Sequence, residues 1–298
     1  MLRIPGDKCV YSMNRHNPAV AETIPGTQVV FETKDCFSNR VTSEQDLYAR
    51  GAWSGINPAT GPLRVTGAHP GDVLVVDILD IRVAARGAMI AVPGIGALGH
   101  HITHNQTKIV PIEEDHALFN EKLRLPVRPM IGVIGTAPAD GDVPTGTPGD
   151  HGGNMDTKLI ARGTTLYLPV FVDGANLAMG DLHALMADGE VIICGVEVPG
   201  EVTVRVDLVA GKSIPSPILE TEDGFYCLAS AKTLDEAAAM AMDHTMSFLR
   251  RRLPLSVNDL AMLMSLVCDL QISQVVDPLR TVRMAVPKRT FEPYGLRF

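Results

Sequence analysis

The sequence predicts a mainly β, sandwich-like fold with a smaller C-terminal α+β portion. Runs rich in β-branched residues recur between glycine and proline turns up to about residue 210, whereas helical spacing appears only near the end. Helices this few and this late do not fit alternating βαβ units. We therefore expect a mainly β domain over residues 1–210, which carries the functional site, and an α+β portion over 211–298 with two helices packed on it.

The expected strands follow one another along the first domain. They cover residues 26–40, 63–66, 73–81, 129–135, 166–172, 192–198 and 201–209. Pro169 lies inside one of these runs, and this favours an edge strand or a bulge. Asn57–Pro62 reads as a turn, residues 87–104 as a mobile loop rich in glycine and histidine, and residues 138–156 as a stretch with almost no regular structure.

Two helices are expected in the C-terminal portion. Thr233 and Glu236 form a capping-box pattern before alanine and methionine at helical spacing, which predicts a helix to about Leu249. Ser256 is an N-cap candidate for a second helix over 257–270.

Composition excludes several classes of function. With 298 residues, a net charge of −8 and only 5% aromatic residues, the chain has neither the basic patches nor the stacking platforms of a nucleic-acid binder. No stretch of eighteen apolar residues and no secretory leader is present, so we expect a cytoplasmic protein outside the membrane. The five scattered cysteines form no C-x-x-C pair and predict reduced thiols.

The densest functional signal is Pro148–Asp156, where Asp150, His151, Asn154 and Asp156 lie among glycines. Mixed oxygen and nitrogen donors in a loop where backbone can approach closely suit Zn²⁺ or a similar divalent ion. A tight surface turn, in which Asp and Asn bond their own backbone, fits this segment equally well.

A second signal is Gly180-Asp181-Leu182-His183-Ala184, followed by Glu190. On an extended chain Asp181 and His183 face the same side and can reach one ion, while Glu190 returns across a turn. A polar hairpin with a histidine at its rim is the alternative. Two such segments in one chain favour the metal site.

Other candidates carry less weight. His100, His101 and His104 in their glycine-rich loop are more often solvated, so we keep them only as substrate-loop residues. Glu32 and Asp35 share a face only if their strand breaks between them, and otherwise they are exposed charges. No serine elbow, phosphate-binding loop or dinucleotide fingerprint followed by a helix is present.

Several segments together resemble the acetamidase/formamidase family. They run from about residue 16 to 287 and comprise 31–35, 57–62, 148–156, 166–170, 180–184, 188–190 and 272–278. The resemblance implies a mainly β fold, a homodimer, a bound divalent ion discussed as zinc or calcium, and hydrolysis of a short aliphatic amide such as formamide or acetamide. Met186 stands where the family commonly has glutamine, which makes substrate choice less certain than reaction class.

The resemblance, together with the residue patterns described above for Asp150 and His100, gives a set of expected site residues. The predicted catalytic residues are Glu190, Asp35 and His183; the predicted metal ligands are Asp35, Asp181, His183, Glu32 and His151; the predicted substrate-binding residues are Asn154, Asp150 and His100. The expected cofactor is Zn²⁺, with Ca²⁺ as the second choice. Two alternatives stay open: a metal-containing β-sandwich protein that binds a small polar ligand without turnover, and a hydrolase of another amide-like bond.

Overall fold

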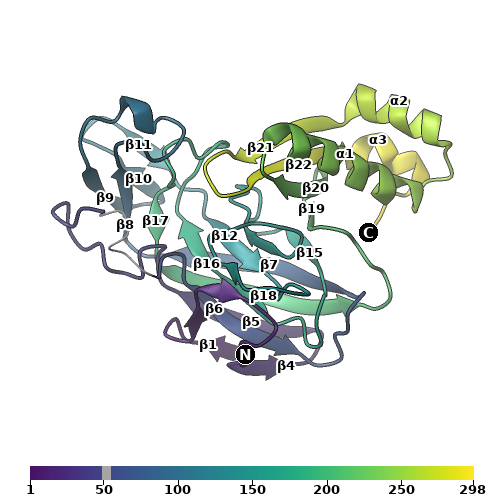
Figure 1. Cartoon of the computed structure of the whole chain (residues 1–298), viewed down its shortest axis with the longest axis horizontal. Helices are drawn as coiled ribbons and strands as arrows, with labels where there is room; N and C mark the ends of the chain where they lie inside the picture. The colour runs from purple at the N-terminus through teal and green to yellow at the C-terminus, as the bar shows by residue number, and fades with distance from the viewer. Residues whose placement is uncertain (49–54) are drawn as a thin grey trace.

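The computed structural model describes residues 1–48 and 55–298, and these form two large β-sheets with a helical layer at one end (Figure 1). The first sheet has nine strands. In spatial order they are β1 (Leu2–Ile4), β5 (Thr27–Thr33), β18 (Gly200–Val209), β7 (Val73–Val83), β15 (Thr165–Pro169), β19 (Ile218–Glu220), β20 (Gly224–Ala231), β22 (Arg280–Pro287) and β21 (Asp269–Gln274).

The second sheet has eleven strands and carries the functional site. Its main path is β11 (Arg124–Pro126), β10 (His116–Leu118), β9 (Gln106–Glu113), β8 (Arg86–Ala91), β17 (Glu197–Val198), β16 (Leu177–His183), β12 (Met130–Gly135) and β14 (Gly152–Asn154). A branch from β16 adds β6 (Ala59–Val65), β2 (Cys9–Val10) and β4 (Ala21–Thr23). A separate pair joins β13 (Val143–Pro144) to β3 (Ser12–Met13).

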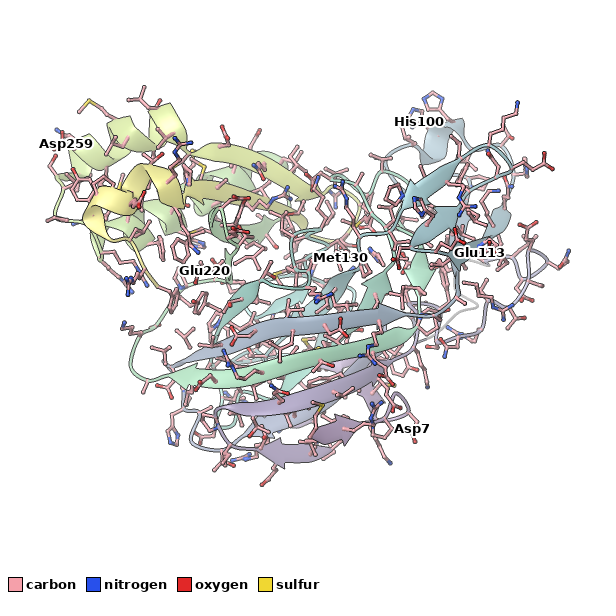
Figure 2. The ribbon with its side chains drawn as sticks, turned by 180° about the vertical axis from the view of Figure 1, so that it is seen from behind. Asp7, His100, Glu113, Met130, Glu220 and Asp259 are labelled. Atoms are coloured by element: carbon pink, nitrogen blue, oxygen red, sulfur yellow. The ribbon has the colours of Figure 1, made fainter. Side chains whose placement is uncertain are left out.

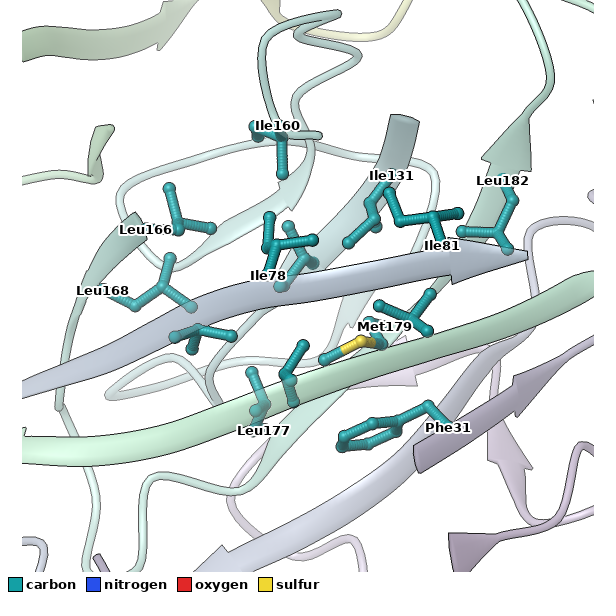
Figure 3. Packing of buried hydrophobic residues seen from close by; sticks show 14 of the residues in the cluster. Phe31, Ile78, Ile81, Ile131, Ile160, Leu166, Leu168, Leu177, Met179 and Leu182 are labelled. Carbon is teal, nitrogen blue, oxygen red and sulfur yellow. The ribbon is translucent and has the colours of Figure 1, made fainter. Parts of the chain in front are cut away.

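The main core lies between the two sheets (Figure 3). Phe31 and Ile78 come from the first sheet, Ile131 and Met179 from the second, and all four are buried. The alternating sequence of β18 fits this position, because Val202, Val204 and Val206 are fully buried while Arg205 is exposed. Each such side chain contributes about 1.5–3 kcal/mol on burial, so the register of the strands near the site is firmly set.

The helical layer covers the end of the first sheet. It comprises α1 (Leu234–Arg250), α2 (Val257–Val267), α3 (Lys288–Phe291) and the short η2 (Glu292–Tyr294); η1 (Gly99–His101) lies elsewhere. The Thr233 side chain accepts a hydrogen bond from the Glu236 backbone in a complete capping box, and Ser256 caps α2 through Asp259. No helix among the described residues is both long and apolar enough to cross a bilayer.

The predicted mainly β class with a late α+β portion is confirmed. The division at residue 210 stays a prediction, and strands on both sides of it pair within the nine-stranded sheet through β15 and β19. The second helix ends at Val267 rather than at residue 270, since the chain leaves it for strand β21.

Four local predictions were wrong, one wholly and three in part. Residues 86–91 form strand β8 rather than a loop, because the alternating side chains of Ala88 and Ile90 are buried in a hydrophobic core. Glycine is required at position 87, since an added Cβ would lie 2.6 Å from the Glu197 carbonyl oxygen. Asn57–Pro62 is a turn only at its start, since β6 begins at Ala59. Pro169 is the last residue of an interior strand, where a missing N–H is tolerated. The 138–156 stretch contains the short strands β13 and β14.

The predicted strand over 192–198 is reduced to Glu197–Val198. The apolar residues before it form a turn, in which the Ile193 backbone N–H donates to the Glu190 carbonyl at 2.9 Å. Ile193 has a φ of 82°, an unusual conformation for a β-branched residue. The residues of this run are apolar because they lie beside a cavity, and they do not pair as a strand in a β-sheet.

Candidate active site

Five buried carboxylates surround one histidine where the second sheet meets the loops at its edge. We call Asp156, Asp181, Glu190, Glu197 and Asp277, together with His183, the carboxylate cluster. Asp181 and His183 lie two apart on β16 and share a side, while the β16–β17 pairing places Glu197 directly opposite His183. None of the six residues is more than 8% exposed.

His183 is at the centre of the cluster. Its Nε2 lies 3.1 Å from Glu197 Oε1, 3.6 Å from Asp181 Oδ1 and 3.8 Å from Asp156 Oδ1. Two amides support the outer carboxylates: Asn57 Nδ2 donates to Asp181 Oδ2 at 3.2 Å, and Asn154 Nδ2 donates to Asp277 Oδ2 at 3.0 Å.

The backbone of the cluster is strained. Asp156, Asp181 and Glu190 all have left-handed backbones, with φ values of 38°, 56° and 47°. Each such conformation costs about 1–3 kcal/mol and is retained where surrounding structure enforces it, commonly at functional sites. Gly132 leaves room for the acids, because an added Cβ there would lie 2.5 Å from Asp156 Oδ1 and 2.8 Å from Asp181 Oδ2.

Burial and mutual repulsion shift the pKa values of the acids upward. Burial first, and then the neighbouring acids, raise the pKa values of Asp156, Glu190 and Asp277 well above their ordinary values. Burial raises the pKa of Glu197 to about 7 against the opposing effect of His183. Burial alone would lower the pKa of His183, but Glu197 and Asp181 outweigh it and raise that pKa well above 6.5.

The donor set fits a divalent cation. Several buried atoms of the cluster have no hydrogen-bond partner among the described residues: both Asp156 carboxylate oxygens, Asp181 Oδ1, His183 Nδ1, Glu190 Oε2 and Glu197 Oε2. Buried acceptors without donors are costly unless a cation or water satisfies them. Their ligand atoms fall into two groups with all separations within 4.8 Å, one of Asp156, His183 and Glu190, the other of Cys36, Asp181 and Glu197.

A cavity of about 500 Å³ opens onto the cluster. Asp181, Glu190, Glu197, Asp277 and Asn154 line its polar end. Asn154 Oδ1 also has no donor among the described residues. A small polar molecule in this end would therefore meet acidic groups and an open amide carbonyl.

The C-terminal portion takes part in building the site. Gly189 donates from its backbone to the Ser273 carbonyl at 2.8 Å and accepts from Val275 at 3.2 Å, so the turn that carries Glu190 is fixed to β21. Beside it, Arg283 forms a bidentate ion pair with Asp188 at 3.0 and 2.7 Å. Asp277 itself comes from the β21–β22 connection.

The structure brings together three of the residues expected from sequence to act in catalysis or metal binding. Asp181, His183 and Glu190 lie in the carboxylate cluster, and Asn154 lines the cavity as a substrate-binding residue should. Their individual roles stay predictions.

The other expected site residues lie outside the cluster, and its geometry gives their predicted roles no support. Glu32 is at the surface with its carboxylate 2.7 Å from Arg3 Nη1. Asp35 is buried, but its Oδ1 accepts the Asn39 backbone N–H at 2.6 Å, so it stabilises a turn that presents Cys36 to the site. His100 is exposed at the tip of the β8–β11 lobe (Figure 2).

Asp150 and His151 belong to the correct segment but are not part of the cavity lining. Asp150 is exposed, and it is not among the residues that line the cavity. His151 is buried outside both ligand groups, where burial lowers its pKa to about 4.

Sequence reasoning missed Cys36, Glu197 and Asp277 as site residues, and it named Asp156 only as one of four possible donors in its segment. Asp156 and Asp277 were inside segments already singled out, and Cys36 follows the residue chosen in its place. Glu197 had a usable signal, because a lone carboxylate in the apolar run Val196-Glu197-Val198 is expensive to bury unless it has a partner.

Comparison with known proteins gives a consistent result. The family model described as the acetamidase/formamidase family matches residues 7–144 and 139–293. The chain is 47% identical to the solved structure of an acetamidase from Bacillus halodurans, with a TM-score of 0.97 and coverage of 99% of this chain and 100% of that one. A predicted acetamidase/formamidase from Thermoanaerobacter tengcongensis is 44% identical, with a TM-score of 0.97 and coverage of 100% and 99%. The acetamidase of Mycolicibacterium smegmatis is 29% identical over 69% of this chain and 68% of its own.

Proposed function

The chain belongs to the acetamidase/formamidase family and is an amidohydrolase, and from this premise we propose that it hydrolyses short linear amides such as formamide and acetamide with a divalent metal ion held in the carboxylate cluster. The observation that supports the metal is the set of buried acceptors without donors at the polar end of the cavity. Family membership argues against a protein without turnover.

The residues that would hold the ion are His183 and the three acids with a carboxylate oxygen within 3.8 Å of its Nε2, Asp156, Asp181 and Glu197. The Cys36 thiol lies within 4.8 Å of ligand atoms of Asp181 and Glu197. Imidazole, thiol and carboxylate donors together suit Zn²⁺, whereas Ca²⁺ prefers six to eight oxygens and is the second choice. When bound, such an ion polarises a carbonyl oxygen and lowers the pKa of a coordinated water to about 7.

Glu190 is the proton carrier in this proposal. Its carboxylate lines the cavity, Oε2 has no hydrogen-bond partner among the described residues, and burial raises its pKa toward the range in which it can both accept and release a proton. It takes a proton from the attacking water and delivers it to the amide nitrogen as the C–N bond breaks. The products are ammonia and the carboxylic acid.

Asn154 would orient the amide group. Its Nδ2 is committed to Asp277, which fixes the side chain, and its Oδ1 is left as an acceptor. An amide –NH₂ is a donor that this oxygen can bind, so the leaving nitrogen would lie at the acidic end of the cavity near Glu190.

We also propose a homodimer in the cytoplasm. Three large apolar side chains on α2 and the edge strand β21 support self-association: Met262, Leu266 and Leu270 are 58%, 78% and 47% exposed. Light scattering of the purified protein measures the mass in solution, and a monomer at micromolar concentration would contradict the dimer.

The central experiment measures bound metal and ammonia release together. Purified protein should contain a stoichiometric divalent ion and release ammonia from formamide and acetamide, and His183→Ala should lose both. Glu32→Gln is the matched control, because its carboxylate is exposed on Arg3 and should leave both unchanged. Turnover by a protein stripped of metal, or full activity of His183→Ala, would reject the proposed chemistry.

A further inference from the structure

The cavity is larger than formamide or acetamide requires. At about 30 Å³ per water-sized group, the four non-hydrogen atoms of acetamide occupy on the order of 120 Å³, roughly a quarter of the cavity of about 500 Å³. Pockets of this size commonly hold ligands of many more atoms.

Apolar side chains supply much of the cavity lining beyond the cluster, together with polar residues such as Asn57, Thr145 and Thr147. We call Ile90, Ile95, Ile193 and Val276 the apolar wall; all four line the same cavity as Asp181 and Glu190. Ile90 is in β8, Ile193 is in the strained turn after Glu190, and Val276 precedes Asp277. Polar and apolar ends are therefore built from the same segments of chain.

The wall is held in place by ordinary packing and hydrogen bonds. Ile90 and Cys194 belong to one buried cluster against which Ile95 and Ile192 pack. The Leu98 backbone donates to the Val191 carbonyl at 3.1 Å, and Gly94 donates to Gly99 at 2.9 Å, so the loop with Ile95 is fixed to the turn after Glu190. A pre-formed apolar surface of this kind binds a hydrocarbon group without an ordering cost.

On the basis of the proposed amide hydrolysis, we propose that the substrates of this enzyme are primary amides with a larger apolar acyl chain, which lies on the apolar wall. The acyl side is favoured over the nitrogen side by the hydrogen-bonding groups. The –NH₂ group is a donor and belongs among the carboxylates and Asn154 Oδ1, whereas an alkyl group on nitrogen would be buried against acceptors that need donors. The acyl chain then projects toward the wall.

A second apolar cavity provides an internal alternative. It has a volume of about 350 Å³, and Glu190 and Cys194 line it as well as the first cavity. Two consecutive residues line different cavities: Ile193 lines the first and Ile192 lines the second. The first is favoured for the acyl chain because Asp181, Glu197 and Asp277 line it, and these residues do not line the second.

The test compares two series of amides on the intact enzyme. Straight-chain primary amides from acetamide to hexanamide should show kcat/KM rising about fourfold per methylene, or about 250-fold over the four added methylenes. N-butylacetamide, an isomer of hexanamide, should show no gain over acetamide. Hydrolysis of acetamide with a flat or falling series, or preference for N-butylacetamide, would overturn the inference; hydrolysis of no amide would reject the proposed function itself.

Two isoleucine variants locate the acyl chain. Ile95→Trp should reduce the hexanamide-to-acetamide ratio of kcat/KM at least tenfold by filling the first cavity, while Ile192→Trp, which fills the second, should leave that ratio unchanged. A reversed pattern would overturn the assignment to the apolar wall. Should Ile95→Trp fail to fold, Ile95→Ala should shift the optimum to a longer acyl chain, and an unshifted optimum would count against the wall.

Discussion

The carboxylate cluster and the Arg283 network are both buried and charged, yet they differ in one respect. Arg283 is 2% exposed, and its guanidinium donates to both Asp188 oxygens, to Gln271 Oε1 at 2.9 Å and to the Ile272 carbonyl at 3.1 Å. In the cluster, equally buried oxygens have no donor among the described residues. The first region satisfies its charges internally, and the second leaves acceptor atoms open, as the proposed cation site requires.

This difference distinguishes buried charges that stabilise the fold from buried charges that serve a function. A buried ion pair with full hydrogen bonding holds elements together, whereas buried like charges on strained backbone destabilise the fold and are retained for what they bind. The two regions are also connected, since Asp188 and Glu190 lie on one turn. The satisfied region fixes the position of the unsatisfied one.

The largest expected effect follows from removing one charge of the cluster. Asp156→Asn should lower ammonia release at least about 100-fold, in line with the loss of a group that supports a bound metal. The same change should raise the free energy of unfolding of the metal-free protein by about 0.5–2 kcal/mol, because it removes the cost of burying this carboxylate and its repulsion from Asp277 and Asp181. Denaturant titration in chelator and an ammonia assay measure the two effects. A variant that loses stability as well as activity would contradict the proposed distinction.

The Arg283 network should respond in the opposite way. Arg283→Met leaves Gln271 Oε1 without this donor and leaves Asp188, whose side chain is 33% exposed, with Lys158 as its remaining ion-pair partner at 2.8 Å. The loss of the buried guanidinium contacts should lower the free energy of unfolding by about 3 kcal/mol, the lower end of the range for a broken buried pair. Arg205→Met is the matched control, because Arg205 forms a half-exposed pair with Asp77, and such pairs contribute about 0.2–1 kcal/mol. Thermal or denaturant unfolding measures both, and equal losses in the two variants would show that burial of the network adds nothing.

Much of the fold was predictable from local patterns. The alternation in β18 and the caps of α1 and α2 are written in neighbouring residues, and each was placed correctly. Glycine misled the prediction at β8, because Gly87 looks like a loop residue but is required by the close approach of the Glu197 backbone. That approach joins segments more than a hundred residues apart and leaves no local trace.

The site was predictable where its residues share a segment. Asp181 and His183 lie two apart on one strand, so their common side follows from strand geometry. Glu197 and Asp277 reach the cluster through sheet pairing and the β21–β22 connection, and these depend on the assembled fold. Asp35 illustrates the limit of a resemblance: it identifies the correct segment, but the side chain that enters the site is the neighbouring Cys36.

His151 provides the smallest test of the comparison, because it is buried yet belongs to neither region. It is 5% exposed and Nε2 has no partner among the described residues, so burial lowers its pKa from 6.5 to about 4. The unfolded chain therefore binds a proton at a higher pH than the folded one, and the stability associated with neutral His151 is present above pH 6.5 and lost as pH falls toward 4. The loss should approach about 3 kcal/mol.

A comparison of the wild type with His151→Gln isolates this contribution, because the buried acids titrate in both proteins. The difference in free energy of unfolding between the two should be constant above pH 6.5. Below pH 6.5 the wild type should lose stability relative to the variant. Parallel stability curves across this range, measured by urea unfolding in the same metal-free buffer, would show that folding leaves the pKa of His151 unchanged. A difference that moved in favour of the wild type as pH falls would instead place His151 with His183, whose pKa its acidic neighbours raise.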